Sequence, residues 1–110
     1  MERFIKGEIV VIPFPFSDLS GSKKRPALVL ADLNGDDIIL CQITSQMTKD
    51  EYTFPINDSD YGSGKLAVKS NIRPNRIFTA DKNIIIKRVA LLNNVTVSRV
   101  VQNILAILSE

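Results

Sequence analysis

The sequence has no histidine and no tryptophan, and a single cysteine, Cys41, in 110 residues. Histidine is the commonest metal ligand and the side chain that most often acts as a general acid or base near neutral pH. Its absence excludes a catalytic imidazole and every histidine-containing metal site. Because carboxylates do not cluster at ligand spacing either, we predict no metal and no cofactor. One cysteine cannot form an intramolecular disulfide, so nothing indicates an oxidising compartment.

Long apolar runs are also missing. A membrane-spanning helix needs about 18 or more consecutive apolar residues, and no segment approaches that length. Near the N-terminus the apolar residues are interrupted by Glu8, Pro13 and Pro15, which is not the pattern of a signal-peptide core. The sequence contains neither a P-loop nor a Rossmann fingerprint. We therefore expect a cytoplasmic protein with no membrane partner.

The composition is typical of one ordinary globular domain. Apolar residues make up 45% and charged residues 24% of the chain, which is long enough to bury a core without metal or disulfide staples. We predict a single domain over residues 1–110. The net charge of +2 is too small to indicate a nucleic-acid partner by itself, so the distribution of charge matters more. Three cations are contiguous: Lys23, Lys24 and Arg25.

The N-terminal third predicts a strand, a loop and a second strand. Residues 8–14 are rich in Ile and Val and end among prolines, which have no N–H to donate to a sheet. Residues 16–24 contain Ser, Asp and Gly, so we expect a long loop there. Pro26 disfavours helical backbone at the residue before it, and the apolar run that follows predicts a strand over residues 27–32.

A hairpin is predicted next. Asn34–Gly35 separates the second strand from an apolar run over residues 37–43, and both turn residues tolerate the positive φ of a type I′ turn. The two strands should therefore be antiparallel neighbours. Their pairing returns the chain toward Arg25, so we expect Thr44 at the same end of the sheet as Arg25.

The second half of the chain predicts further short strands. Pro55 indicates a sheet edge, because proline removes a ladder donor. Pro74 and Asn75 are expected to separate two strands, and a turn followed by a strand is expected late in the chain. Several short strands with turn signals between them are typical of a small barrel or a strongly curled sheet. The expected segments are 52–56, 65–68, 70–73, 76–80 and 82–92.

The C-terminal segment predicts an amphipathic helix packed on the sheet. Apolar residues recur there at helical spacing, and Asn93, Asn94 or Thr96 is a suitable N-terminal cap. The predicted fold class is therefore mainly β with a C-terminal helix. The recurring apolar residues are Val97, Val100, Val101, Ile104, Leu105 and Leu108.

The residue types at the expected meeting point suit phosphate chemistry. If the 2′-hydroxyl of an RNA attacks the adjacent phosphorus, the protein must align the reacting groups and neutralise charge on the phosphoryl oxygens. An arginine fork is permanently charged and matches phosphate oxygens, which makes Arg25 the candidate for stabilising the charge and assisting proton transfer. A threonine hydroxyl both donates and accepts, so Thr44 is the candidate for positioning the scissile group.

Three sequence blocks also carry a family resemblance. They are Gly7-Glu8-Ile9-Val10-Val11-Ile12-Pro13-Phe14, then Arg25-Pro26-Ala27-Leu28-Val29-Leu30, then Ile43-Thr44-Ser45-Gln46. In motif, order and spacing the chain resembles the MazF/PemK family of toxin endoribonucleases, up to about Lys82.

The resemblance implies an SH3-like barrel, metal-independent cleavage of single-stranded RNA at short motifs, a homodimer, and inhibition by a cognate antitoxin. It implies Arg25 and Thr44 as the catalytic pair. The expected products are a 2′,3′-cyclic phosphate and a 5′-hydroxyl. The residues that we expect to bind RNA are Lys23, Lys24, Ser45, Gln46 and Arg73.

The chain departs from the family pattern in three places, one of which is a C-terminal helix that is less charged than in many members. The loop before Arg25 is shorter than in many members and presents two lysines. Some members have an arginine three residues before an aspartate late in the fold, whereas here Phe78 precedes Asp81 at that spacing. Arg73 or Arg76 is a candidate to compensate, and Asp81 itself is predicted to be a turn residue.

Two other functions remain open at this point. One is a non-catalytic toxin resembling the CcdB branch, which shares the fold but acts by binding gyrase. The other is an SH3-like interaction module whose basic residues are an ordinary solvated surface.

Overall fold

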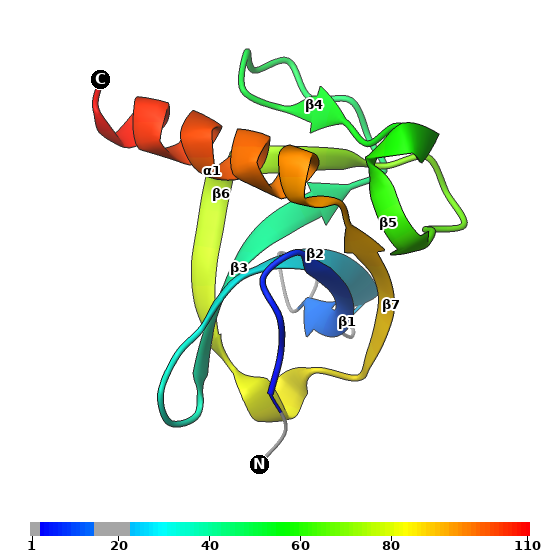
Figure 1. Cartoon of the computed structure of the whole chain (residues 1–110), viewed down its shortest axis with the longest axis vertical. Helices are drawn as coiled ribbons and strands as arrows, with labels where there is room; N and C mark the ends of the chain where they lie inside the picture. Colours follow the sequence, from blue (N-terminus) through cyan, green and yellow to red (C-terminus); the bar gives the residue numbers. More distant parts are fainter. Residues whose placement is uncertain (1–2, 15–22) are drawn as a thin grey trace.

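The computed structural model describes residues 3–14 and 23–110, in which seven strands form one curled antiparallel sheet and one α-helix follows (Figure 1). The order of the strands across the sheet is β4-β6-β3-β2-β1-β7-β5. The predicted class, mainly β with a C-terminal helix in a small curled barrel, is confirmed. The elements are β1 (Glu8–Phe14), β2 (Lys23–Asp32), β3 (Asp37–Thr44), β4 (Phe54–Pro55), η1 (Asp58–Asp60), β5 (Tyr61–Gly64), β6 (Asn71–Asp81), η2 (Lys82–Ile84), β7 (Lys87–Leu92) and α1 (Asn94–Leu108).

The central strands bury side chains on both of their faces. In β2, Leu28 and Leu30 join the apolar cluster that contains residues of α1, whereas Ala27 and Val29 join a second cluster on the other face. All four side chains are buried. Because both faces are covered, the strand is apolar at successive positions and does not alternate between apolar and polar residues.

The predicted hairpin is confirmed, but its connection spans residues 33–36 and is longer than the two-residue type I′ turn that Asn34–Gly35 predicts. β2 and β3 are antiparallel neighbours, and the chain reverses through residues 33–36 between them. Gly35 has a φ of 84°, a left-handed backbone that glycine adopts without steric cost. The N–H of Leu33 donates to the carbonyl of Asp37 at 3.2 Å, which closes the turn.

β2 begins earlier than the sequence predicts. Lys23 pairs with Phe14, and Lys24 pairs with Pro13, so both lysines belong to the strand and not to the loop that was expected over residues 16–24. The long partner strand β1 provides the pairing that extends β2 toward its N-terminal end. The remainder of the expected loop, residues 16–22, lies outside the described residues.

Three other expected segments differ from the structure. The strand expected over residues 52–56 is reduced to Phe54–Pro55, at an edge of the sheet as Pro55 indicates. The prediction of a strand over residues 65–68 is wrong, because the strand in this region, β5, ends at Gly64. Pro74 does not end a strand: β6 continues through it, because a break in register opposite β3 leaves this proline without a ladder partner.

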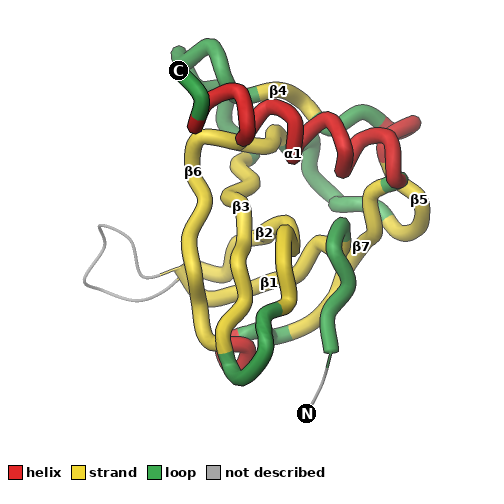
Figure 2. The backbone as a smooth tube through the Cα atoms, turned by 60° about the vertical axis from the view of Figure 1, so that its left-hand side comes forward, coloured by secondary structure: helices red, strands yellow, loops and turns green. Residues whose placement is uncertain are grey.

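The helix α1 begins as predicted. Asn93 is the N-cap, and its side-chain oxygen accepts a hydrogen bond from the N–H of Thr96 at 2.8 Å. Val97 and Val100 bury the inner side of the helix against the sheet, while Leu105 and Leu108 stay exposed near its end. Figure 2 shows α1 lying across one end of the curled sheet. In the described residues no helix has the length and apolar character needed to cross a membrane.

Candidate functional site

The end of β3 forms a polar turn that is held in place by a buried amide. Thr44 is the last residue of the strand, and its Oγ1 accepts a hydrogen bond from the N–H of Gln46 at 3.2 Å. Asn71 is only 4% exposed, and its Nδ2 lies 3.4 Å from the carbonyl oxygens of both Thr44 and Gln46, to which it donates. The turn therefore keeps a fixed shape, while Ser45 and Gln46 remain exposed. The Thr44 hydroxyl proton stays available for a ligand.

The basic cluster occupies the first residues of β2. Lys23 and Lys24 are exposed, and Arg25 is half-buried and pairs with Ile12 of β1. Within the described residues, no ion pair or hydrogen bond engages the side chain of any of these three cations. Their charge is therefore available to an anion.

The pairing of β2 with β3 places the two polar segments at one end of the sheet. The last pair at this end joins Ala27 to Gln42, in the same register as Leu28 and Cys41. Arg25 and Thr44 each lie two residues beyond this last pair, so both are at this end of the sheet. Because side chains alternate along a strand, Arg25 lies on the face of Ala27, and Thr44 lies on the face of Gln42. The expectation that Thr44 returns to the end of the sheet that carries Arg25 is confirmed.

A cleft opens at the same end of the sheet. Its volume is about 240 Å³, and it brings together the start of β2, the end of β3 and a segment between β5 and β6. Strand alternation places the apolar side chains of Pro26 and Ile43 on the face opposite to that of Arg25 and Thr44. Arg25 lines the cleft, whereas Thr44 is not among its lining residues. The lining residues are 24–26, Ile43, Ser45, 66–68 and Ser70.

Arg73, expected to bind RNA, is engaged within the protein. Its Nη2 donates to Oδ2 of Asp50 at 3.0 Å, and the two side chains are only 16% and 22% exposed. Asp50 also accepts hydrogen bonds from the N–H groups of Tyr52 and Thr53, at 2.9 Å and 2.8 Å. The pair thus fastens the segment after β3 to β6. Contact between Arg73 and RNA stays a prediction.

The hydrogen bonds to Asp50 predict a pH-dependent contribution to stability. They hold the pKa of this carboxyl well below its ordinary value of 3.8, and the bond from the Thr53 N–H has the largest effect. A depressed pKa contributes stability that is present above the unfolded pKa and is lost as the pH falls toward the folded value. We expect Asp50→Asn to lower the urea midpoint of unfolding at pH 7. The difference in midpoint between the variant and the wild type should narrow below about pH 4. Urea titrations at several pH values measure this difference; a difference that does not change with pH contradicts the stabilising role of the Asp50 carboxylate.

Cys41 lies in the core, as expected, next to the break in register between β3 and β6. Its Sγ donates to the carbonyl oxygen of Arg73 at 3.1 Å, and the side chain is fully buried. Burial raises the pKa of the thiol to about 12. Cys41 is therefore a packing residue and not a nucleophile.

Asp81 lies far from the polar turn. It pairs with Asp37 at the start of β3, whereas Thr44 is at the other end of that strand. Its side chain accepts from the N–H of Asn83 at 2.8 Å and caps η2, so the predicted role as a turn residue is confirmed. Phe78 packs against the second apolar cluster, and Arg76 is exposed on β6. In the described residues no group of three or more His, Cys, Asp or Glu side chains is placed to hold a metal ion.

Sequence reasoning missed two parts of this site. Asn71 showed no motif, and its only signal was a polar residue next to an apolar strand position, Ile72. The segment 66–70 was expected to be partly a strand, but it lines the cleft as an irregular segment. Both contributions depend on pairing between residues that are distant in the sequence.

Comparison with protein families gives one match. Residues 5–108 match the model of a family described as PemK-like, MazF-like toxin of type II toxin-antitoxin system. No curated protein shows significant similarity to the chain.

Several solved structures have the same fold. An endoribonuclease from Mycobacterial species has a TM-score of 0.75 at 13% identity, covering 99% of this chain and 94% of its own. An endoribonuclease in complex with its cognate antitoxin, also from Mycobacterial species, has a TM-score of 0.76 at 11% identity, covering 97% and 96%. MazF from Deinococcus radiodurans has a TM-score of 0.72 at 17% identity, covering both chains completely. At such low identity these similarities establish the fold.

Proposed function

Because the chain belongs to the PemK-like, MazF-like toxin family of type II toxin–antitoxin systems, we propose that it is a metal-independent endoribonuclease acting on single-stranded mRNA. Two solved structures that share its fold are endoribonucleases. The observation that supports the proposal is the location of Arg25, a cation with no partner in the described residues, at the same end of the sheet as the fixed turn of Thr44.

The proposed reaction uses a nucleophile supplied by the substrate. The 2′-hydroxyl of a ribose loses its proton as its oxygen attacks the adjacent phosphorus, and the bond from phosphorus to the 5′-oxygen breaks. The 5′-oxygen takes up a proton and leaves as a hydroxyl, so one proton is released and one is taken up. The products are a 2′,3′-cyclic phosphate and a 5′-hydroxyl. Arg25 stabilises the charge on the phosphoryl oxygens and assists proton transfer, and the Thr44 hydroxyl donates to the scissile group and positions it. A fixed geometry at the start of the reaction lowers its entropic cost.

The surrounding polar residues are proposed to bind the RNA. Lys23 and Lys24 are exposed on the strand that carries Arg25, where their charges attract phosphates. Ser45 and Gln46 are exposed on the fixed turn and present hydroxyl and amide groups to the bases. Arg73 stays a proposed RNA contact, and its ion pair with Asp50 fastens the segment after β3 to β6.

We further propose that the chain acts as one domain, in the cytoplasm where its mRNA substrate lies, and as a homodimer neutralised by a cognate antitoxin. The family match over residues 5–108 supports a single unit. A similar solved structure contains an endoribonuclease with its cognate antitoxin, which supports the antitoxin partner. Exposed Leu105 and Leu108 at the end of α1 offer apolar area for a second copy.

The proposal is tested by incubating the purified protein with a long RNA in excess EDTA. We expect cleavage to continue, because the proposed chemistry needs no metal, and we expect the fragments to carry 2′,3′-cyclic phosphate and 5′-hydroxyl ends. Resistance of the 5′ ends to ligation without prior phosphorylation identifies the hydroxyl. Inhibition of gyrase without RNA cleavage would show the CcdB-like alternative to be correct, and neither activity would indicate a binding module.

A further inference from the structure

A second and larger hollow lies beside the cleft. Its volume is about 570 Å³, within the range of sites that hold one small ligand or a nucleotide. Leu66, Ala67, Val68 and Ser70 line both spaces, so the irregular segment between β5 and β6 forms a wall that the cleft and the hollow share. A small ligand in the cleft would not contact the hollow. A polymer that extends from the cleft over this wall would contact both.

The lining of the hollow suits a nucleotide. Tyr61 borders it and is half-buried, with its ring packed against the apolar cluster and its hydroxyl accepting from the N–H of Leu66 at 3.4 Å. An aromatic ring held in this way is a stacking surface for a base. Leu66 is half-buried and adds apolar area, and the exposed residue Ser59 brings a hydroxyl to the border.

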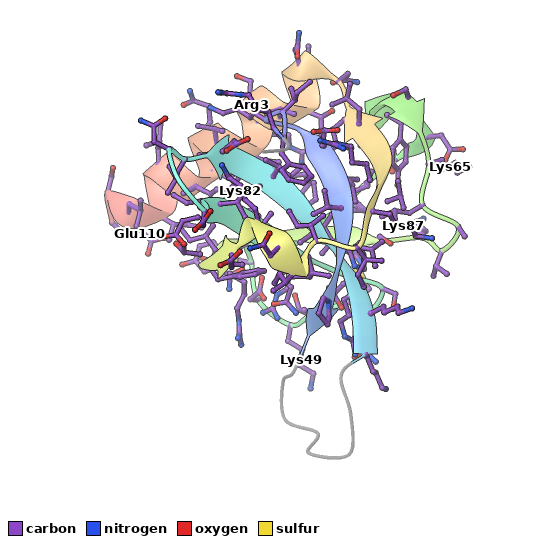
Figure 3. All side chains as sticks on the ribbon, turned by 90° about the horizontal axis from the view of Figure 1, so that it is seen from below. Arg3, Lys49, Lys65, Lys82, Lys87 and Glu110 are labelled. Atoms are coloured by element: carbon purple, nitrogen blue, oxygen red, sulfur yellow. The ribbon has the colours of Figure 1, made fainter. Side chains whose placement is uncertain are left out.

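The two lysines of the hollow differ in their partners. Lys65 forms an ion pair with Asp58 at 2.9 Å on the outer side of the molecule, where Figure 3 shows it. Lys69 is exposed and has no ion-pair or hydrogen-bond partner in the described part of the chain. Lys69 lies between Val68 and Ser70 of the shared wall and lines the hollow. Its ammonium is therefore placed to meet a phosphate that passes from the cleft to the hollow.

We propose that this hollow is a second RNA subsite, which binds a nucleotide some distance along the strand from the linkage held by Arg25 and Thr44. Tyr61 contacts the base, and Lys69 contacts a phosphate. The inference rests on the proposed function for the identity of the polymer. The subsite contributes affinity and base preference but takes no part in bond breaking.

The experiment compares Lys69→Gln with Lys6→Gln, a matched change at an exposed lysine that lines neither space. The binding probe is a fluorescein-labelled 2′-fluoro RNA of about 16 nucleotides, which lacks the attacking hydroxyl, and the second probe is the corresponding dinucleotide, whose single linkage occupies the cleft alone. Anisotropy gives Kd between about 50 and 200 mM salt. Cleavage kinetics are measured on natural RNAs of the same two lengths.

We expect Lys69→Gln to weaken binding of the long probe about threefold to tenfold and to reduce the slope of log Kd against log salt by about 0.7, the value for one phosphate contact on a single strand. KM for the long RNA should rise in proportion, with kcat unchanged. Binding and cleavage of the short RNA should stay at wild-type values, as should every measurement on Lys6→Gln.

Equal losses on the long and short probes, or no loss on either, would overturn the subsite. Failure of the proposed function has a different result: the wild-type protein then cleaves no natural RNA. If it still binds the long probe, and Lys69→Gln weakens that binding as expected, the subsite stands while the catalytic proposal fails. If the wild-type protein binds neither probe, both proposals fail.

Discussion

Replacement of Arg25 by alanine should reduce RNA cleavage about 1000-fold while the protein remains folded. Of the three cations of the cluster, Arg25 is the nearest along β2 to the last pair with β3, Ala27–Gln42, and within the described residues its guanidinium has no competing partner. Its removal leaves the charge that develops on the phosphoryl oxygens without a fixed donor. Single-turnover cleavage of a long RNA measures the loss, and circular dichroism and urea unfolding report the fold.

Two further variants test the role of Arg25: one separates the shape of the guanidinium from its charge, and the other is a control. Arg25→Lys keeps the charge but loses the planar fork, so we expect it to recover a small part of the rate. Arg3→Ala removes an exposed arginine at the N-terminus and should cleave at the wild-type rate. A wild-type rate in folded Arg25→Ala would remove this residue from the mechanism.

Thr44→Val should lower the cleavage rate about 10-fold to 100-fold. Valine matches threonine in shape and keeps the strand end, but it cannot donate to the scissile group. It also removes the acceptor that receives the Gln46 N–H at 3.2 Å, so the turn loses one of its fixing bonds. The expected loss is smaller than that at Arg25 because a neutral donor stabilises the developing charge less than a guanidinium does.

Thr44→Ser is the control for this variant, because serine keeps the hydroxyl and therefore both interactions. We expect it to retain most of the wild-type rate in single-turnover assays. Loss of activity in Thr44→Ser equal to that in Thr44→Val would mean that the methyl group matters and the hydroxyl does not, which contradicts the positioning role.

Local sequence rules predicted the elements that depend on neighbouring residues. The hairpin at Asn34–Gly35, the helix cap at Asn93 and the edge strand at Pro55 all appear in the structure, since turn, cap and edge chemistry act within a few residues. Predictions failed where a partner strand decided the outcome. β6 runs through Pro74 because the register opposite β3 breaks there, which no local pattern reveals.

The same distinction applies to the candidate site. The sequence by itself determined the available chemistry: no imidazole, one cation cluster just before a predicted strand, and a hydroxyl at the end of the next strand, which a turn joins to the first. Since a hairpin fixes which ends meet, the convergence of Arg25 and Thr44 was predictable from the chain alone. That reasoning does not extend to contacts between distant strands.

Tertiary structure alone decided the supporting contacts. The Asn71 amide holds the turn of Thr44, the Asp50 carboxylate engages Arg73, and Asp81 lies at the opposite end of β3. Each of these depends on the register of β6, which is paired with β3 across more than twenty intervening residues. The register between distant strands depends on the packing of both sheet faces and on the bulge at Pro74. Both form only when the strands come together in the curled sheet.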